Sequence, residues 1–156
     1  MNTQNVVHGN LITFAEQGFF DVIVQGCNLK GVMGAGIAQE IAGRYPEALI
    51  ADRGSLHLPY DRLGAYTMAT VESPLGYGFT IVNAYTQRDT SRHSRQVDYD
   101  AVANVFALIA QNFEGKRIAY PRIGAGLAGG DWDIINGIIQ NTLAGTSHTL
   151  VEYVPE

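Results

Sequence analysis

Cysteine and long apolar stretches are the two features that this sequence of 156 residues has least of. Its one cysteine, Cys27, cannot form an internal disulfide or a cluster of thiolate ligands for zinc, which excludes a disulfide framework and fits a reducing compartment. Apolar runs such as Val102 to Ala110 and Ile134 to Ile139 fall short of the about 20 helical residues that cross a bilayer core. The N-terminal residues show no secretory signal. We therefore expect a cytoplasmic protein without a membrane span.

Charged residues are also few. They make up 16% of the chain, and the formal net charge is -5 at pH 7. A surface that neutralises nucleic-acid phosphates would be basic, so we expect neither a nucleic acid nor a membrane as a partner. Any anion that binds is expected to be held by backbone N–H groups. The apolar fraction of 46% suits a packed core, and the length suits one compact domain over residues 1–156.

Hydrophobic patterning predicts an α/β domain. Short β-branched and apolar runs indicate strands at Asn5 to Ile12, Asp21 to Gln25, Ala65 to Val71, Phe79 to Ala84, Arg117 to Tyr120 and Thr149 to Val154. Helical spacing begins at Gly34, Asp98 and Asp131, and Pro46 stops or restarts the first of these helices. The stretch Thr86 to Gln96 has no apolar residue and predicts a solvated loop or lid. This order predicts helices packed on a mixed, mostly parallel sheet of about six strands.

The stretch AYPRIGAGLAGGDW, Ala119 to Trp132, contains GxGxxG between a short apolar run and a helical pattern. In a dinucleotide-binding fold this motif lies on the first strand and helix, and an acidic residue follows about 20 residues later, where Glu152 stands here. The motif lies near the end of this chain, however, so half of such a fold would be missing. The phosphate-binding pattern GxxxxGK[ST] does not occur, so nucleoside-triphosphate hydrolysis has no support.

A second glycine-rich stretch, GCNLKGVMGAGIA from Gly26 to Ala38, also follows a predicted buried strand and precedes a helix. Glycines in such a place let backbone N–H groups converge on a phosphate at the positive end of the helix dipole. Two such loops at the carboxyl ends of strands in one sheet would form the walls of one cleft, which suits a ligand with a central diphosphate. The alternative is that the glycines only serve tight turns and close helix packing.

At these residues the chain resembles the macrodomain family, which binds ADP-ribose, and within it the branch of ADP-ribose 1″-phosphate phosphatases, which includes phage-encoded members. The resemblance spans nearly the whole chain in family order. Its matching segments are HGNLITF (His8 to Phe14), GCN (Gly26 to Asn28), MGAGIA (Met33 to Ala38), RYPEA (Arg44 to Ala48), VNAYTQ (Val82 to Gln87), VDYDAV (Val97 to Val102) and IGAGLAGGDW (Ile123 to Trp132). The resemblance implies a three-layer α/β/α fold and, for a phage-encoded member, the host cytoplasm.

The resemblance also implies roles for single residues. Asn10 stands where most macrodomains carry an aspartate that accepts from the adenine amino group, and an asparagine can still accept through its side-chain oxygen. Asn28 matches the asparagine that holds the distal ribose. Tyr85 stands at the distal-ribose end, although a tyrosine there could equally pack on the core. The complete set of expected ligand-binding residues is Gly9, Asn10, Leu11, Cys27, Asn28, Met33, Gly34, Ala35, Gly36, Ile37, Tyr85, Pro121, Ile123, Gly124, Ala125, Gly126 and Leu127.

The expected chemistry is hydrolysis, but the sequence shows no evident general acid or general base. Cys27 fits a small buried core residue better than a nucleophile, because Lys30 is the only cation in the loop after it. Asn28 is expected to orient the substrate. Gln25 replaces a histidine that some relatives carry two residues before the Cys-Asn pair, and Asp131 fits a helix cap better than a base. Both nevertheless stand as catalytic candidates beside Asn28.

Other chemistries find less support in the sequence. The stretches NAYTQ and GLAGG hold neither the lysine nor the aspartate with which a few relatives cleave ADP-ribose from carboxylates. The cations Arg88, Arg92, His93 and Arg95 of the predicted lid could meet a terminal phosphate, although a solvated charged loop explains them more simply. No group of residues has metal-ligand spacing, so we expect neither a metal nor a cofactor.

We therefore expect an enzyme that binds ADP-ribose derivatives and removes the phosphate of ADP-ribose 1″-phosphate by attack of water. Two alternatives stay open at this point. One is a module that binds ADP-ribose, free or on ADP-ribosylated macromolecules, and performs no chemistry. The other is a hydrolase of ADP-ribose esters or of mono-ADP-ribosylated targets, which would use the same pocket with a different leaving group.

Overall fold

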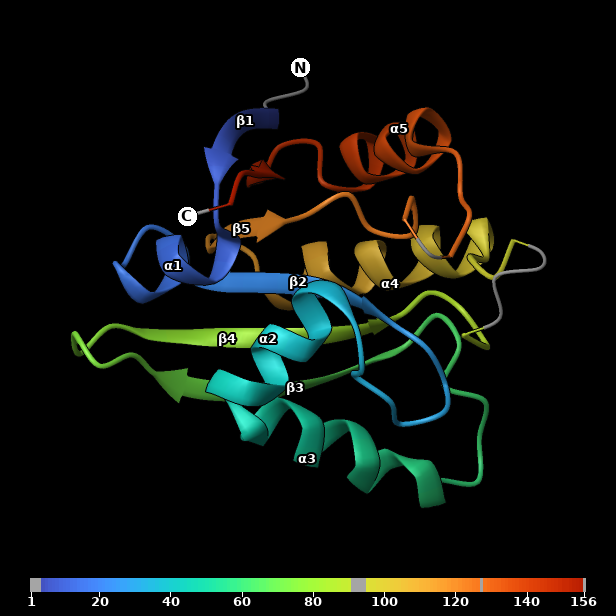
Figure 1. The fold of residues 1–156 in the computed structure, drawn as a ribbon. Helices are drawn as coiled ribbons and strands as arrows, with labels where there is room; N and C mark the ends of the chain where they lie inside the picture. The colour runs from blue at the N-terminus through green and yellow to red at the C-terminus, as the bar shows by residue number, and fades with distance from the viewer. Residues whose placement is uncertain (1–3, 91–94, 127, 156) are drawn as a thin grey trace.

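A sheet of six strands forms the centre of the computed structural model, which describes residues 4–90, 95–126 and 128–155 (Figure 1). The strands are β1 (Gln4–Gly9), β2 (Val22–Cys27), β3 (Tyr66–Glu72), β4 (Gly78–Tyr85), β5 (Arg117–Tyr120) and β6 (Ser147–Tyr153). The helices are α1 (Leu11–Glu16), α2 (Gly36–Arg44), α3 (Pro46–Gly54), α4 (Tyr99–Asn112) and α5 (Trp132–Thr142), with a 3₁₀ turn η1 (Ser55–His57). The strand order is β1-β6-β5-β2-β4-β3, and all neighbours are parallel except β3 and β4, which form an antiparallel hairpin. The expected mixed, mostly parallel sheet is confirmed.

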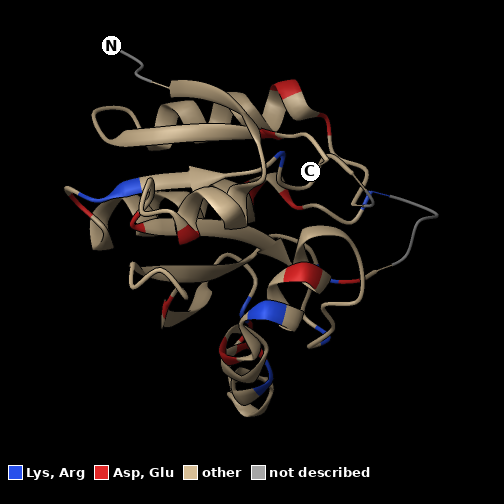
Figure 2. Cartoon of the chain, turned by 60° about the vertical axis from the view of Figure 1, so that its left-hand side comes forward, with Lys and Arg blue, Asp and Glu red and all other residues tan. Residues whose placement is uncertain are grey.

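Helices cover both faces of the sheet because side chains on the central strands alternate between two apolar cores. Val22 and Val24 of β2 belong to the core under α4 and α5, whereas Ile23 belongs to the core under α1, α2 and α3. In β4, Val82 belongs to the first of these cores and Ile81 to the second. Neither β2 nor β4 carries a charged residue, and in Figure 2 the charged residues lie mostly on helices and loops. Strands that bury both faces need a layer on each side, which gives the predicted three layers.

Local signals decide where several helices begin. The carboxylates of Asp98 and Asp131 accept hydrogen bonds from backbone N–H groups in the first turns of α4 and α5, where both helices are predicted to start. Pro46 restarts the helical path as the first residue of α3, because its missing N–H would be unpaired there anyway. No helix of the described residues is long and apolar enough to cross a bilayer.

One helix differs from the prediction. The predicted strand Asn5 to Ile12 is too long, because β1 ends at Gly9 and α1 follows. Asn10 Oδ1 accepts hydrogen bonds from the N–H groups of Ile12 and Thr13 at 2.9 and 3.2 Å, which caps α1. The asparagine was a visible cap signal, but the apolar residues after it also continue the pattern of the strand before it.

The chain leaves β2 and β5 in opposite directions, although the two strands are neighbours in the sheet. After β2 it enters α2 on one face, and after β5 it enters α5 on the other face. Such a divergence opens a crevice at the carboxyl ends of the strands, which is where open α/β sheets bind ligands. In Figure 1 the loops that follow β2, β4 and β5 gather at the same end of the sheet.

A fully buried histidine, His148, lies in β6 away from this crevice. The Tyr120 hydroxyl lies 2.7 Å from His148 Nδ1 and accepts from the Gln4 amide at 2.7 Å. The other ring nitrogen, Nε2, has no hydrogen-bond partner among the described residues. Burial lowers the pKa of His148 below its ordinary value, because a charged ring would lose its hydration.

We expect His148 to make the stability of the fold depend on pH. Because the pKa of His148 is lower in the folded chain than in the unfolded chain, the free energy of unfolding is highest above about pH 6.5 and falls as the pH drops toward the folded-state pKa. One proton gives a slope of at most about 1.4 kcal/mol per pH unit. Urea unfolding from about pH 7.5 to about pH 5 measures this slope. The His148→Asn variant keeps an acceptor for Tyr120 but cannot ionise, so an equally steep profile in that variant would contradict the assignment.

Candidate functional site

Two glycine loops face each other at the carboxyl ends of β2 and β5. The first glycine loop, residues 28–35, joins β2 to α2, and the second glycine loop, residues 121–131, joins β5 to α5. Together they border a cavity of about 320 Å³, which we name the loop pocket. Its lining residues are Gly26, Cys27, Asn28, Val32, Gly34, Ala35, Ala38, Gln87, Thr90, Gly124, Gly126 and Ala128. The structure thus brings both predicted glycine stretches to one cavity.

Backbone groups dominate the side of the loop pocket that the first glycine loop provides. α2 begins after Ala35 without a side-chain cap, so the N–H groups of its first turn have no partner within the helix. Gly34, Ala35 and Gly36 are all exposed, and a Cβ placed on Gly36 would meet nothing within 4 Å. The positive end of the α2 dipole is therefore accessible, as binding of an anion at a helix start requires.

The glycines of the second glycine loop differ in whether a side chain would fit at their positions. Packing requires Gly124 and Gly130, because a Cβ on them would come within 2.7 and 2.6 Å of Val97. The Gly130 N–H also donates to the Gly124 carbonyl at 2.7 Å, and Gly124 has a positive φ of 74°. Gly126 is different, since a Cβ there would meet nothing within 4 Å. Tight packing thus explains Gly124 and Gly130, but it does not explain the glycine at position 126 that lines the loop pocket.

Asn28, the predicted ribose-binding residue, both lines the loop pocket and shapes the first glycine loop. Its Oδ1 accepts from the Lys30 N–H at 2.8 Å, and its Nδ2 donates to the Val32 carbonyl at 3.0 Å. These two bonds use one acceptor and one donor position of a side-chain amide that has two of each. The second acceptor and the second donor have no partner among the residues that the structure describes, so both can serve a ligand hydroxyl.

A second cavity of about 380 Å³, which we name the edge pocket, lies between α2 and the sheet edge formed by β1 and β6. Its lining residues are Gly9, Asn10, Leu11, Gly36, Ile37, Glu40, Pro121, Val151 and Tyr153. Most of these are apolar or glycine, with Asn10 and Glu40 as the polar side chains. The residues just before α2 line the loop pocket, and Gly36 and Ile37 at its start line the edge pocket. An elongated ligand could therefore occupy both pockets at once.

A buried ion pair supports the first glycine loop from the interior. Arg62 donates to the Leu29 carbonyl at 2.5 Å and lies 3.4 Å from Asp52, with the two side chains 8% and 1% exposed. The Ser55 hydroxyl accepts from Arg62 at 2.8 Å, and the Arg62 guanidinium lies 4.5 Å from the centre of the Tyr85 ring. The first glycine loop is thus tied to a cluster of polar groups that water does not reach.

Tyr85 occupies a place other than the expected one. Its side chain is fully buried and lines neither pocket, and its hydroxyl donates to Asp52 Oδ1 at 2.7 Å. Burial raises the pKa of Tyr85 to about 12. The structure therefore agrees with the core-packing alternative. Tyr85 contacts Asp52 and Arg62 of the buried cluster rather than either pocket.

Several other predicted residues also lie behind the pockets. Gln25 is fully buried and donates to Asn83 Oδ1 at 2.9 Å, so it is not in contact with either cavity. Asp131 is the cap of α5 and does not line the loop pocket. The predicted ligand-binding residues that line neither pocket are Met33, Tyr85, Ile123 and Ala125, and Leu127 lies outside the described residues.

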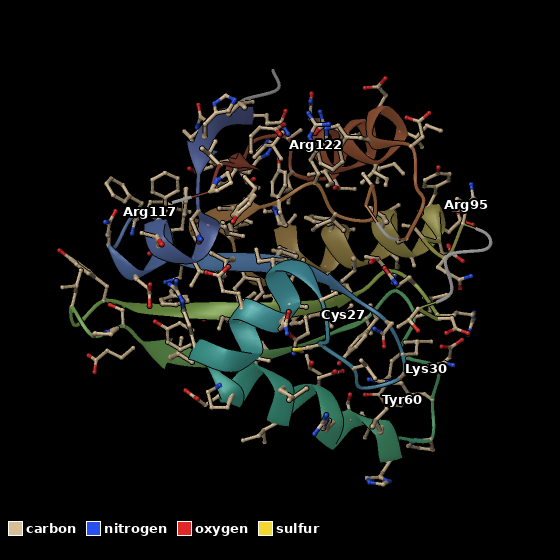
Figure 3. All side chains as sticks on the ribbon, viewed as in Figure 1. Cys27, Lys30, Tyr60, Arg95, Arg117 and Arg122 are labelled. Atoms are coloured by element: carbon tan, nitrogen blue, oxygen red, sulfur yellow. The ribbon has the colours of Figure 1, made fainter. Side chains whose placement is uncertain are left out.

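Cys27 lines the loop pocket but is only 5% exposed. Figure 3 shows it inside the fold beside α2, whereas Lys30 lies on the outer part of the first glycine loop. Burial, with a further contribution from Asp52, raises the pKa of the Cys27 thiol well above its ordinary value. The thiol is therefore protonated at neutral pH, which fits the predicted core residue rather than a nucleophile.

Both pockets have lining residues that are missing from the predicted ligand-binding set. In the loop pocket these are Gly26, Val32, Ala38, Gln87, Thr90 and Ala128, and in the edge pocket they are Glu40, Val151 and Tyr153. Helical spacing from Ile37 could have indicated Glu40, and Gln87 and Thr90 belong to the predicted lid, although nothing local singles them out within it. Among the predicted lid cations, Arg88 pairs with Asp61 at 2.8 Å, Arg95 lies over the Tyr99 ring, and Arg92 and His93 fall outside the described residues.

Comparisons with known proteins identify the fold. No family model matches the sequence. A 17.5 kDa uncharacterized protein of enterobacteria phage T4 is 28% identical over 156 residues, which cover 96% of each chain. A macrodomain protein from Streptomyces coelicolor has a TM-score of 0.74 at 24% identity, covering 97% of this chain and 100% of its own. This chain has the macrodomain fold. DarTG of Thermosipho africanus, solved in complex with ADP-ribose, matches this chain with a TM-score of 0.78 at 20% identity, covering 99% of this chain and 43% of its own.

We expect the Arg62→Met variant to lower the free energy of unfolding by about 3 kcal/mol, because it leaves Asp52 buried without a charged partner. Urea unfolding at neutral pH measures the loss. The matched control is Arg88→Met, whose ion pair with Asp61 is more than half exposed on both sides, so the stability should change little. Equal effects of the two substitutions would show that the buried cluster does not support the fold.

Proposed function

We propose that this macrodomain binds ADP-ribose across its two pockets and removes the phosphate of ADP-ribose 1″-phosphate. The supporting observation is that two glycine loops and the uncapped start of α2 border the loop pocket, next to a largely apolar edge pocket. Backbone N–H groups suit a diphosphate, and apolar walls suit a flat base. The complex of Thermosipho africanus DarTG with ADP-ribose, a structure of similar fold, adds support for this ligand.

In this proposal the ligand runs along the start of α2. The adenine ring enters the edge pocket, and the diphosphate crosses the N–H groups of Gly36 and Ile37. The distal ribose enters the loop pocket, where the spare donor and acceptor of Asn28 meet its hydroxyls. The second glycine loop closes over the diphosphate with Gly126, whose missing side chain leaves room for the phosphate oxygens.

The proposed reaction is attack of water on the terminal phosphorus. The bond between phosphorus and the C1″ oxygen breaks, one water proton ends on the released sugar hydroxyl, and the other stays with inorganic phosphate. Backbone N–H groups of the glycine loops would stabilise the negative charge that develops on the phosphoryl oxygens. No charged side chain lines the described part of the loop pocket, so neutral groups such as Gln87 and Thr90 would orient the water.

The same neutral lining favours a second candidate function. A general acid or base is the usual source of rate in hydrolysis, and the described lining of the loop pocket supplies none among its side chains. The macrodomain would then bind ADP-ribose, free or attached to a macromolecule, without breaking a bond. Both candidates use the same two pockets, and they differ in whether phosphate is released.

Incubation of the pure protein with ADP-ribose 1″-phosphate tests the proposed reaction. We expect free phosphate to appear with wild-type protein and its release to fall about tenfold or more in the Asn28→Ala variant, which loses the ribose contacts and a bond within the first glycine loop. A malachite-green assay measures the phosphate. Binding of ADP-ribose by calorimetry without phosphate release would favour the module that performs no chemistry.

Substitution Gly126→Glu tests the second glycine loop. A Cβ fits at position 126 without contact, so the fold should persist while the new carboxylate repels a bound diphosphate. We expect the affinity for ADP-ribose to fall at least about tenfold by calorimetry. The control is Gly137→Glu on α5, where a Cβ also meets nothing within 4 Å, and the affinity should not change. Equal affinities of the two variants would remove the second glycine loop from the site.

A further inference from the structure

Glu40 is the one charged side chain among the described residues that line the edge pocket. It comes from α2, one turn after Ile37, and it faces walls that are otherwise apolar, backbone or amide in character. A carboxylate accepts hydrogen bonds and donates none when ionised. A ligand that fills this cavity should therefore be flat and largely apolar, and it should present a hydrogen-bond donor toward α2.

The Glu40 carboxylate is held in place through one of its two oxygens. Asn10 Nδ2 donates to Oε1 at 3.2 Å, and Arg44 Nη2 lies 3.0 Å from the same oxygen. No contact of Oε2 with another described residue is seen. The side chain is 32% exposed and lines the edge pocket, so the carboxylate is accessible to a ligand there. One oxygen thus fixes the orientation of the carboxylate while the other can accept a new bond.

Asn10 cannot accept a hydrogen bond from the ligand without losing a bond that caps α1. Its Oδ1 already accepts from the N–H groups of Ile12 and Thr13, which uses both of its lone-pair positions. Its Nδ2 is a donor and is directed at Glu40. An amino group of a ligand would find no free acceptor at position 10 unless α1 lost its cap. The nearest carboxylate on the same cavity wall belongs to Glu40.

We propose that Glu40 is the residue that reads the base, by accepting a hydrogen bond from the exocyclic amino group of adenine through Oε2. This inference rests on the proposed binding of ADP-ribose and adds the group that selects the base. Asn10 and Arg44 are positioning residues that hold the carboxylate, and Tyr153, which is 67% exposed at the same cavity, supplies an aromatic face for the ring. The edge pocket therefore prefers a base with an amino group to one that lacks it at the same position.

The analogue of ADP-ribose that carries unsubstituted purine tests the proposal, because a hydrogen replaces the amino group while N1 stays an acceptor. We expect wild-type protein to bind ADP-ribose about tenfold more tightly than the purine analogue by calorimetry. In Glu40→Gln, whose amide can either accept or donate, the ratio of the two affinities should fall close to one. The control Glu47→Gln makes the same charge change on α3, where the side chain is exposed and lines neither pocket, and it should keep the wild-type ratio.

The outcomes separate this proposal from the proposed function. If wild-type protein binds neither ligand, the binding of ADP-ribose itself fails, and the role of Glu40 fails with it. If it binds both ligands equally, or if Glu40→Gln keeps the wild-type ratio, only the role of Glu40 is overturned. The ratio is taken within one variant, so a general loss of affinity does not imitate the effect. Glu40→Ala, with its melting temperature compared with that of wild type, provides a second variant that should also lose the preference.

Discussion

The site depends on the divergence of the chain after two neighbouring strands. β2 and β5 are hydrogen-bonded to each other and run parallel, yet one continues into α2 and the other into α5 on the opposite face of the sheet. The loops between each strand and its helix must then separate at the sheet end, and the loop pocket is the space between them. Backbone N–H groups line this space because glycine leaves no side chain to fill it.

The site also requires that the first glycine loop keeps its shape. Hydrogen bonds from Asn28 and from the buried Arg62 hold this loop. Asn28 forms bonds within the loop, while Arg62 holds the Leu29 carbonyl from the interior and balances the charge of Asp52. An unbalanced charge at that depth would destabilise the fold, so the cluster is formed in full or the loop is lost. Tyr85, a fully buried residue, belongs to this cluster through its hydrogen bond to Asp52.

The parts of the fold that follow from local pattern could be predicted from the sequence, and the parts that depend on distant pairing could not. Strands with both faces buried, helices after Asp98 and Asp131, and glycines between strand and helix all leave a signal within a few residues. Those signals locate the two glycine loops, whereas their meeting depends on the pairing of β2 with β5. The inward direction of Tyr85 depends on Asp52 and Arg62, which no sequence spacing links to it.

The two pockets differ in the charge of their lining residues. Two cations close to the first glycine loop are paired, Lys30 with Asp89 at 3.1 Å and Arg88 with Asp61 at 2.8 Å, so these two add little net positive field at the loop pocket. No charged side chain lines the described part of the loop pocket, so the fixed backbone dipoles around it would act only over short distances and on an anion that fits between the loops. A long polyanion such as a nucleic acid gains nothing from such a site on a chain of net charge -5. In the proposed mode of binding, selection of the ligand would therefore depend on shape at the loop pocket and on the carboxylate of Glu40 at the edge pocket.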